Sequence, residues 1–166
     1  MSRRSKYNVD TSNKEKRTCD DIVFDSMDEM RFYRDWLCPK VESGEIIGYE
    51  LQKKYELQPK FINKNGKPVR PIDYVADFVV TYKDGSVDVI DVKGCPDSMA
   101  KTKRKLFWYV YPDINYIWIA YSKKYGDEAN GYWMEYDELN NCRNANKRRR
   151  KAELKEKENG EEQNNS

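Results

Sequence analysis

Acidic residues interrupt two strongly apolar stretches near the middle of the chain. Asp77 lies within Tyr74–Val80, and Asp91 lies within Asp88–Gly94, with Lys93 two positions further on. An unpaired buried carboxylate is costly, so acids in buried strands generally have a partner or a chemical role. Residues two apart on a strand share a face, which places Asp91 and Lys93 together. Two carboxylates and a lysine on one sheet face suit a divalent-metal site that activates water.

The turn between these two stretches decides whether Asp77 and Asp91 meet. A two-residue loop would pair Asp77 with Val92 and place the two acids on opposite faces. A three-residue loop, Lys83-Asp84-Gly85, with Gly85 in the left-handed conformation, pairs Asp77 with Asp91. Only the three-residue loop builds a site, so we favour that register.

A helix expected from Ser26 to about Pro39 offers a third acid, Glu29. Ser26 is a good N-cap residue. The apolar face of this helix consists of Phe32, Tyr33, Trp36 and Leu37. Glu29 lies three and four positions before the first two of them, on the same inward stripe. The alternative is a capping box formed by Ser26 and Glu29, and spacing alone leaves both interpretations open.

Composition narrows the chemistry. The 166 residues are enough for one domain, and none of them is histidine. This excludes nucleases of the His-Me finger type, Ser-His-Asp hydrolases and histidine-ligated zinc sites. The four cysteines are scattered without a CxxC pair, which is typical of reduced thiols. With no signal region and no membrane-spanning segment, the sequence predicts a soluble, cytoplasmic protein.

Charge divides the chain into three parts. Residues 1–18 hold six Lys or Arg and two acids and predict a basic, disordered N-terminal arm. Residues 19–141 are expected to form the ordered domain. Residues 142–166 predict a charged tail, disordered or partly helical. Its run Lys147–Lys151 suits either a solvated tail or an arm that binds phosphate.

A second helix is expected from Asp97 or Ser98 to Tyr111. The inward stripe predicted for it consists of Met99, Thr102, Leu106, Tyr109 and Val110. The cations on its other faces are Lys101, Lys103, Arg104 and Lys105. They suit either a solvated face or a contact with the backbone of DNA.

The remaining pattern predicts an α/β fold. Extended segments are expected at 46–61, 73–81, 87–93 and 115–121. The central segments are apolar on both faces, which calls for helices on both sides of a mixed central sheet.

A helix carrying a glutamate, followed by Asp and Asp-x-Lys on adjacent strands, resembles the PD-(D/E)XK nuclease superfamily. The segments Phe24–Glu29, Tyr74–Phe78 and Asp91–Gly94, with the basic helix after them, are similar to a small phage and prophage family. That family is in turn similar to archaeal Holliday-junction resolvases and to the endonuclease subunit of heteromeric transposases. The resemblance covers roughly residues 22–121. Ala76 stands where the superfamily has proline, and Asp91 is the shorter of the two acids that the pattern permits.

The resemblance implies a restriction-endonuclease-like core and a metal-dependent endodeoxyribonuclease. It implies that Glu29, Asp77 and Asp91 bind Mg²⁺ or Mn²⁺ and that Lys93 is the catalytic lysine. Its substrate would be DNA, including branched recombination intermediates, and cleavage of a symmetric junction would require a homodimer. A non-cleaving nucleic-acid-binding or assembly protein on the same fold is the alternative.

Overall fold

A five-stranded mixed sheet forms the centre of the protein. The structure is a computed structural model in which residues 14–164 are described, with side chains to Glu156. The strands, in their order across the sheet, are β3 (Ile46–Gln58), β6 (Ile72–Tyr82), β7 (Val87–Val92), β8 (Asn115–Tyr121) and β9 (Trp133–Glu135). β7 and β8 are parallel and every other neighbouring pair is antiparallel. The chain reaches β8 from β7 through α3 (Ser98–Val110), as a parallel pair requires.

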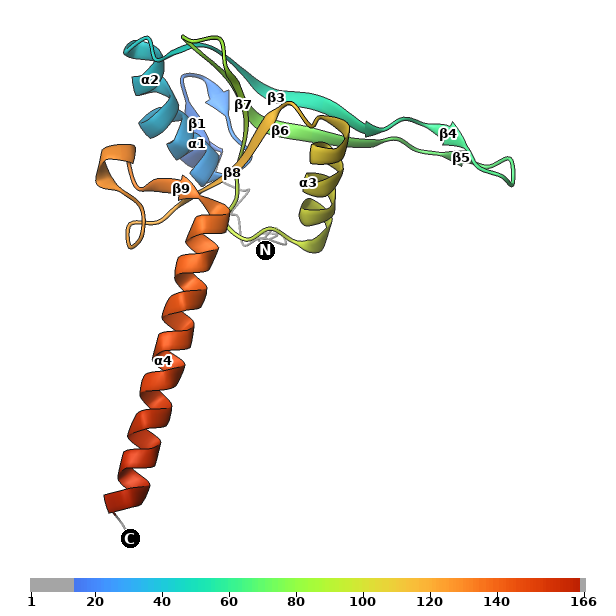
Figure 1. Cartoon of the computed structure of the whole chain (residues 1–166). Helices are drawn as coiled ribbons and strands as arrows, with labels where there is room; N and C mark the ends of the chain where they lie inside the picture. Colours follow the sequence, from blue (N-terminus) through green and yellow to red (C-terminus); the bar gives the residue numbers. More distant parts are fainter. Residues whose placement is uncertain (1–13, 165–166) are drawn as a thin grey trace.

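Helices cover both faces of this sheet (Figure 1). On one face, Phe32 and Leu37 of the first helical segment pack with Phe78 and Ile90. On the other face, Phe107 of α3 packs in a separate cluster. The other buried members of that cluster are Tyr55, Leu57, Tyr74, Ala76, Val79, Val89, Tyr116 and Trp118. The predicted mixed α/β fold with helices on both faces is confirmed.

The first helical segment runs past the proline at which we expected it to end. It consists of α1 (Met27–Phe32), a π-helical segment η2 (Tyr33–Leu37) and α2 (Cys38–Glu42). Pro39 lies in the first turn of α2. Proline lacks an N–H and clashes with the carbonyl of the preceding turn, and the wider π turn just before it relieves both problems.

The hairpin between β6 and β7 has the three-residue loop predicted from the sequence. Phe78 pairs with Ile90, and Thr81 pairs with Val87. The N–H of Tyr82 donates to the carbonyl of Ser86 across 2.9 Å, and Gly85 has a φ of 85°. The favoured register is therefore confirmed, and it brings Asp77 level with Asp91.

The β3–β6 ribbon reverses its two faces near Asp77. Along β6, Tyr74 and Ala76 belong to the core cluster on the α3 side, but so does Val79, which breaks the alternation of a regular strand. The residue beside Asp77 on β3 is Gln52, whose φ of 52° is left-handed. Local distortions of this kind re-aim side chains and are common beside active sites.

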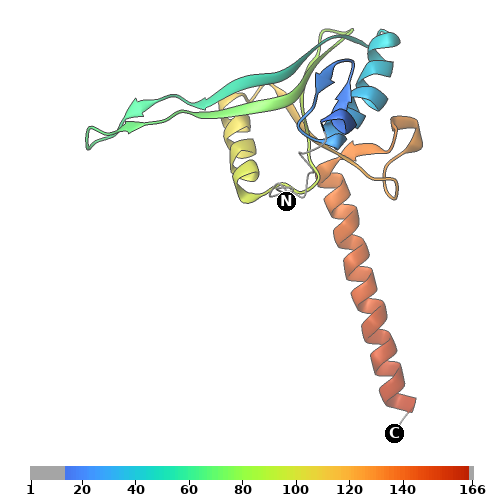
Figure 2. The same ribbon diagram turned by 180° about the vertical axis from the view of Figure 1, so that it is seen from behind.

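Beyond this point the two strands leave the body as a long arm (Figures 1 and 2). After Gln58 the arm continues through β4 (Phe61–Ile62) and β5 (Pro68–Val69), which pair with each other. The tight turn at the end of the arm lies at residues 63–67.

The inward stripe predicted for α3 is right for Leu106 and wrong for its other members. Met99 is 61% exposed and Tyr109 is 84% exposed, whereas Phe107 is fully buried. Ala100 and Leu106 pack against the same cluster as Phe107. Two charged side chains of α3 also face inward, Lys103 toward the carbonyl of Asp73 and Arg104 toward Trp118. A search for apolar periodicity could not reveal a face that includes them.

The two ends of the described chain also differ from expectation. Arg17 is buried and donates to the carbonyl of Phe24, so the ordered domain includes part of the predicted N-terminal arm. The rest of that prediction, over residues 1–13, lies outside the described residues. At the other end, α4 (Tyr136–Asn164) is one continuous helix that leaves the body (Figure 1) and includes most of the tail predicted to be disordered or partly helical. Strong helix formers and an Arg149–Glu153 pair support it.

The smaller elements complete the described chain. They are η1 (Glu15–Arg17), β1 (Thr18–Cys19), β2 (Ile22–Val23) and η3 (Glu128–Asn130). All four cysteines are free thiols, as predicted. Within the described residues, no helix combines the length and the apolar character needed to cross a bilayer.

Candidate active site

Asp77 is fixed at the point where the ribbon reverses its faces. Its Oδ2 accepts a hydrogen bond from the backbone N–H of Val92 across 2.8 Å. The side chain therefore turns toward the end of β7 instead of following the alternation of β6. This contact brings it beside Asp91, whose negative charge is close enough to affect its ionisation.

Asp91 and Lys93 form a partly buried ion pair. Lys93 Nζ lies 2.8 Å from Asp91 Oδ2. The Asp91 side chain is 2% exposed and that of Lys93 is 27% exposed, so the lysine lies between the buried acid and the solvent. The prediction that these two residues share a face is confirmed.

Tyr116 is a member of this group that sequence reasoning missed. Its hydroxyl donates to Asp91 Oδ2 across 3.3 Å and accepts from Trp118 Nε1 across 2.6 Å. Both rings come from β8, whose parallel pairing with β7 places Asp91 opposite Trp118. Their alternation with apolar residues in β8 was the available signal, but only the crossover shows which acid they reach.

Glu29 is buried, 7% exposed, and its contacts match the capping-box alternative. Ser26 Oγ donates to Glu29 Oε1 across 2.8 Å, and the N–H of Asp25 donates to Oε2 across 3.1 Å. The N–H of Glu29 in turn donates to Ser26 Oγ across 3.1 Å. Both carboxylate oxygens therefore accept hydrogen bonds from residues at the N-terminus of α1. The same side chain is also near enough to Asp77 to act on its charge.

Burial and neighbouring charges shift the pKa values of Asp77, Glu29 and Lys93. Burial raises the pKa of Asp77 well above its ordinary value of 3.8, and the charges of Asp91 and Glu29 raise it further. Burial also raises the pKa of Glu29, against the lowering effect of the Ser26 hydrogen bond. For Lys93, burial alone would lower the pKa, but the surrounding carboxylates outweigh it and the pKa is raised. The group thus sets three carboxyl groups against a single ammonium group.

This surplus of carboxylate charge fits a divalent cation held by two acids. Mg²⁺ in proteins is bound through one or two carboxylates, with water and substrate phosphate completing its shell. Asp77 and Asp91 fit that role, whereas both oxygens of Glu29 are engaged at the helix start. Among the described residues, no group of three or more Asp, Glu or Cys side chains is arranged to hold a metal ion. The three-ligand set stays a prediction.

The basic residues of α3 divide into two kinds. Lys101 and Lys105 are exposed. Lys103 Nζ donates to the carbonyl of Asp73 across 2.6 Å, and Arg104 Nη1 lies 2.8 Å from Asp137 Oδ2. Two of the four cations predicted to contact DNA therefore make contacts within the protein, and the nucleic-acid role stays a prediction for the exposed pair.

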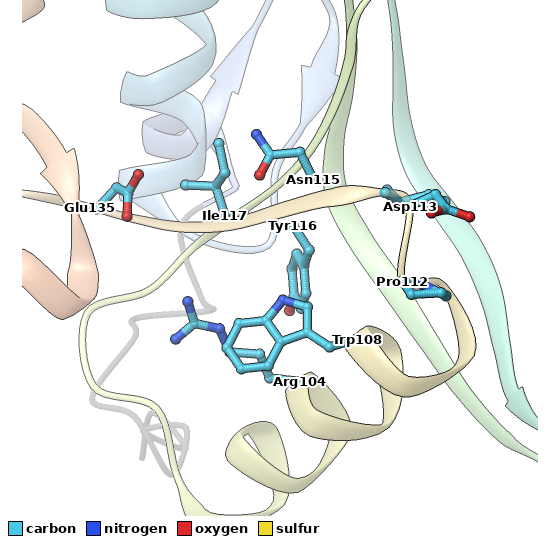
Figure 3. A pocket seen from close by; sticks show the side chains of 9 residues that line it. Arg104, Trp108, Pro112, Asp113, Asn115, Tyr116, Ile117 and Glu135 are labelled. Carbon is cyan, nitrogen blue, oxygen red and sulfur yellow. The ribbon is translucent and has the colours of Figure 1, made fainter.

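Arg104 also lies between two tryptophan rings. Its guanidinium carbon is 4.5 Å from the Trp108 ring centre and 4.3 Å from that of Trp118. Figure 3 shows Arg104 and Trp108 of α3 facing Tyr116 of β8 across a pocket of about 530 Å³. Glu29, Asp77 and Asp91 do not line this pocket. Arg104 thus packs on Trp118, whose Nε1 donates to the Tyr116 hydroxyl.

Comparison with known proteins places the chain in a family without supplying a reaction. A family model described as "Protein of unknown function (DUF1064)" matches residues 4–127. The matched range includes all three acids and Lys93. No curated protein and no solved structure matches the chain.

Proposed function

The chain belongs to the DUF1064 family, and we propose from its site that it is a metal-dependent endonuclease that hydrolyses phosphodiester bonds in DNA. The observation that carries the proposal is the buried Asp91–Lys93 pair with Asp77 held beside it by the Val92 N–H. Buried acids whose proton affinities are strongly shifted by one another cluster at functional sites.

A structural ion pair explains this site less well. One aspartate and one lysine would neutralise each other and would leave Asp77 as a further acid without a lysine of its own. Burial raises the pKa of Asp77 well above 3.8, so keeping this carboxyl group ionised is unfavourable. A divalent cation offsets that cost and gives the arrangement a purpose.

The residues of the chain have distinct parts in the proposed reaction. When bound, Mg²⁺ or Mn²⁺ would lower the pKa of a coordinated water and neutralise charge on the phosphate. Asp77 and Asp91 would hold it. Lys93, oriented by its 2.8 Å contact with Asp91, would place its ammonium against the negative charge that develops on the phosphate. Because Lys93 is the more exposed member of the pair, a phosphate can approach it from solvent.

The proposal includes the setting that the resemblance implied. The substrate is DNA, with branched recombination intermediates of phage or prophage origin included, and the compartment is the bacterial cytosol, which suits four free thiols. Two copies would be needed to cut a symmetric junction on both sides.

The test is metal-dependent cleavage by the parent protein and by Lys93→Met. The substrates are labelled duplex, nicked, flap and four-way-junction DNA, with and without Mg²⁺ or Mn²⁺. Methionine keeps the apolar stem and removes the charge, so DNA binding should persist while single-turnover cleavage falls by about 10²–10³. Lys83→Met, at an exposed position in the β6–β7 turn, is the matched control and should cut like the parent.

Two results would overturn the proposal. Parent-like cleavage by Lys93→Met would make the lysine structural. Failure of the parent to cut any of these DNAs with either metal would leave the non-cleaving alternative.

A further inference from the structure

The arm formed by residues 52–73 is the feature that the proposed reaction leaves unused. Its outer part, residues 59–71, holds four cations and no acids. These cations, all exposed, are Lys60, Lys64, Lys67 and Arg70. Phe61 and Ile62 between them are 48% and 66% exposed. Both views of the molecule show this part extending away from the body (Figures 1 and 2).

The arm is built as a defined ribbon. At its base, Tyr55 packs on Phe107 of α3 with ring centres 5.0 Å apart, and Tyr111 Oη donates to the carbonyl of Glu56. At its tip, Asn63 Oδ1 accepts from the N–H groups of Asn65 and Lys67, each across 3.0 Å. An uncovered two-stranded ribbon has little stability of its own, so such an ordered projection calls for a partner.

We propose that the arm is a second DNA-binding element that contacts duplex phosphates on one side of the cleavage site. This inference rests on the proposed function, because DNA is its partner. Four cations without an acid match the charge of a phosphate backbone. A two-stranded ribbon is also narrow enough to enter the major groove. The apolar pair at the tip suits contact with base edges once phosphates have positioned the ribbon.

The position of the arm sets where it would touch the DNA. Asp77 and the arm belong to the same strand, β6, so the site lies at the base of the arm. At about 3.3 Å per residue, Arg70 and Lys67 lie at most about 23 and 33 Å along the chain from Asp77. With about 3.4 Å per nucleotide along one strand of a duplex, the cations fall roughly 7 to 10 base pairs from the scissile phosphate.

The test uses DNA binding without divalent metal, so that it does not depend on cleavage. Affinity is measured by fluorescence anisotropy over a range of salt concentrations. Replacing Lys60, Lys64, Lys67 and Arg70 by glutamine should lower the slope of log affinity against log salt by about 3 to 4, since each phosphate contact contributes about 0.9.

A matched control keeps the change of charge and moves it elsewhere. The double variant Lys64→Gln/Lys67→Gln should lower the slope by about 2. Lys40→Gln/Lys83→Gln removes the same amount of charge from the body of the protein, where both lysines lie near Glu45. This double variant should leave the slope of log affinity against log salt unchanged. Equal effects of the two double variants would overturn the proposal, because they would report only net charge.

Shortening the arm gives an independent readout. Gln58 and Ile72 are paired, so residues 59–71 can be replaced by an Asn-Gly turn that closes the hairpin below the tip. The parent should bind duplexes of two turns, roughly 20 base pairs, more tightly than those of one turn. The shortened protein should lose that preference. If the shortened protein keeps the preference for longer duplexes, the proposal is wrong. It is also wrong if shortening converts a dimer into a monomer and leaves the salt slope of DNA binding unchanged.

The outcome separates this inference from the proposed function. The shortened protein keeps Asp77, Asp91 and Lys93, so at saturating concentration it should cut DNA at the parent rate. If the parent cuts but the arm variants bind normally, only the arm proposal fails. If the parent does not cut but the arm variants lose salt-dependent binding, only the nuclease proposal fails.

Discussion

The backbone N–H of Val92 donates to Oδ2 of Asp77 across 2.8 Å. This contact follows directly after Phe78 and Ile90, the last residue pair of the β6–β7 ladder. This hydrogen bond links β6 to β7 at the point where β3 and β6 begin to turn away from β7. It also fixes Asp77 beside Asp91, so the repulsion between two acids is part of the folded state. That repulsion has measurable consequences.

Without divalent metal, the free energy of unfolding should fall as the pH rises above 3.8, the ordinary pKa of aspartic acid. Burial and the charge of Asp91 raise the pKa of Asp77 in the folded protein, so the folded state binds the proton more tightly than the unfolded chain. Stability is therefore lost between the unfolded and the folded pKa. Each tenfold difference in proton affinity corresponds to about 1.4 kcal/mol.

Asp77→Asn should flatten this pH dependence, as measured by denaturant unfolding in EDTA. Asp113→Asn, at an exposed acid, is the control and should behave like the parent. A parent-like pH dependence in Asp77→Asn would show that Asp77 is not under strain.

Mg²⁺ or Mn²⁺ should raise the melting temperature by mass action. A cation at a hundred times its dissociation constant stabilises the folded state by about 2.7 kcal/mol. Asp77→Asn and Asp91→Asn should each abolish this rise, and Asp77→Asn should make the metal-free protein more stable. Differential scanning fluorimetry with and without metal measures both effects. An undiminished rise in both variants would remove the metal site.

Glu29→Ala should cost about 1 kcal/mol of stability, because it removes the acceptors that cap α1. Glu29→Gln should cost less, since an amide can accept from Asp25 N–H and donate to Ser26 Oγ. The Gln variant should nevertheless bind Mg²⁺ about ten-fold more weakly than the parent, because it loses a negative charge next to the metal ligands. Isothermal titration with Mg²⁺ measures this, and unaltered affinity would assign Glu29 to capping alone.

Arg104→Ala should destabilise the protein by about 2 kcal/mol, because the guanidinium is desolvated between two tryptophan rings and its stem is packed. Lys105→Ala, at the next and exposed position, should change stability by less than about 0.5 kcal/mol. Urea unfolding compares the two. In DNA binding the order should reverse, with the exposed lysine contributing more to the salt dependence. Equal stability of the two variants would contradict the stacking argument.

The hairpin was predictable from sequence because its signals are local. The sequence allowed two registers, and the structure has the one favoured because it brings Asp77 level with Asp91, with Gly85 left-handed. The inward position of Glu29 followed from helical periodicity, although its carboxylate turned out to be occupied at the helix start.

Other features depend on contacts that no local pattern reveals. Arg104 faces inward because Trp118 arrives from another strand and Asp137 from another helix, so the apolar stripe of α3 pointed to the wrong face. Helical geometry continues past Pro39 because a π turn precedes it. Tyr116 reaches Asp91 only through the parallel crossover of β7 and β8.

The arm begins at the reversal of faces at Gln52 and Asp77. In an ordinary hairpin, inserting one residue into a strand would transfer every later side chain to the other face. Here the pairing of β3 with β6 keeps one register across the reversal, Leu51 with Phe78 and Lys53 with Ala76, so the faces change without a change of partners. Residues can be added or removed in matched pairs beyond Gln58 without disturbing the acids. In the proposed complex, the length of the arm would set how far from the cut the protein contacts DNA.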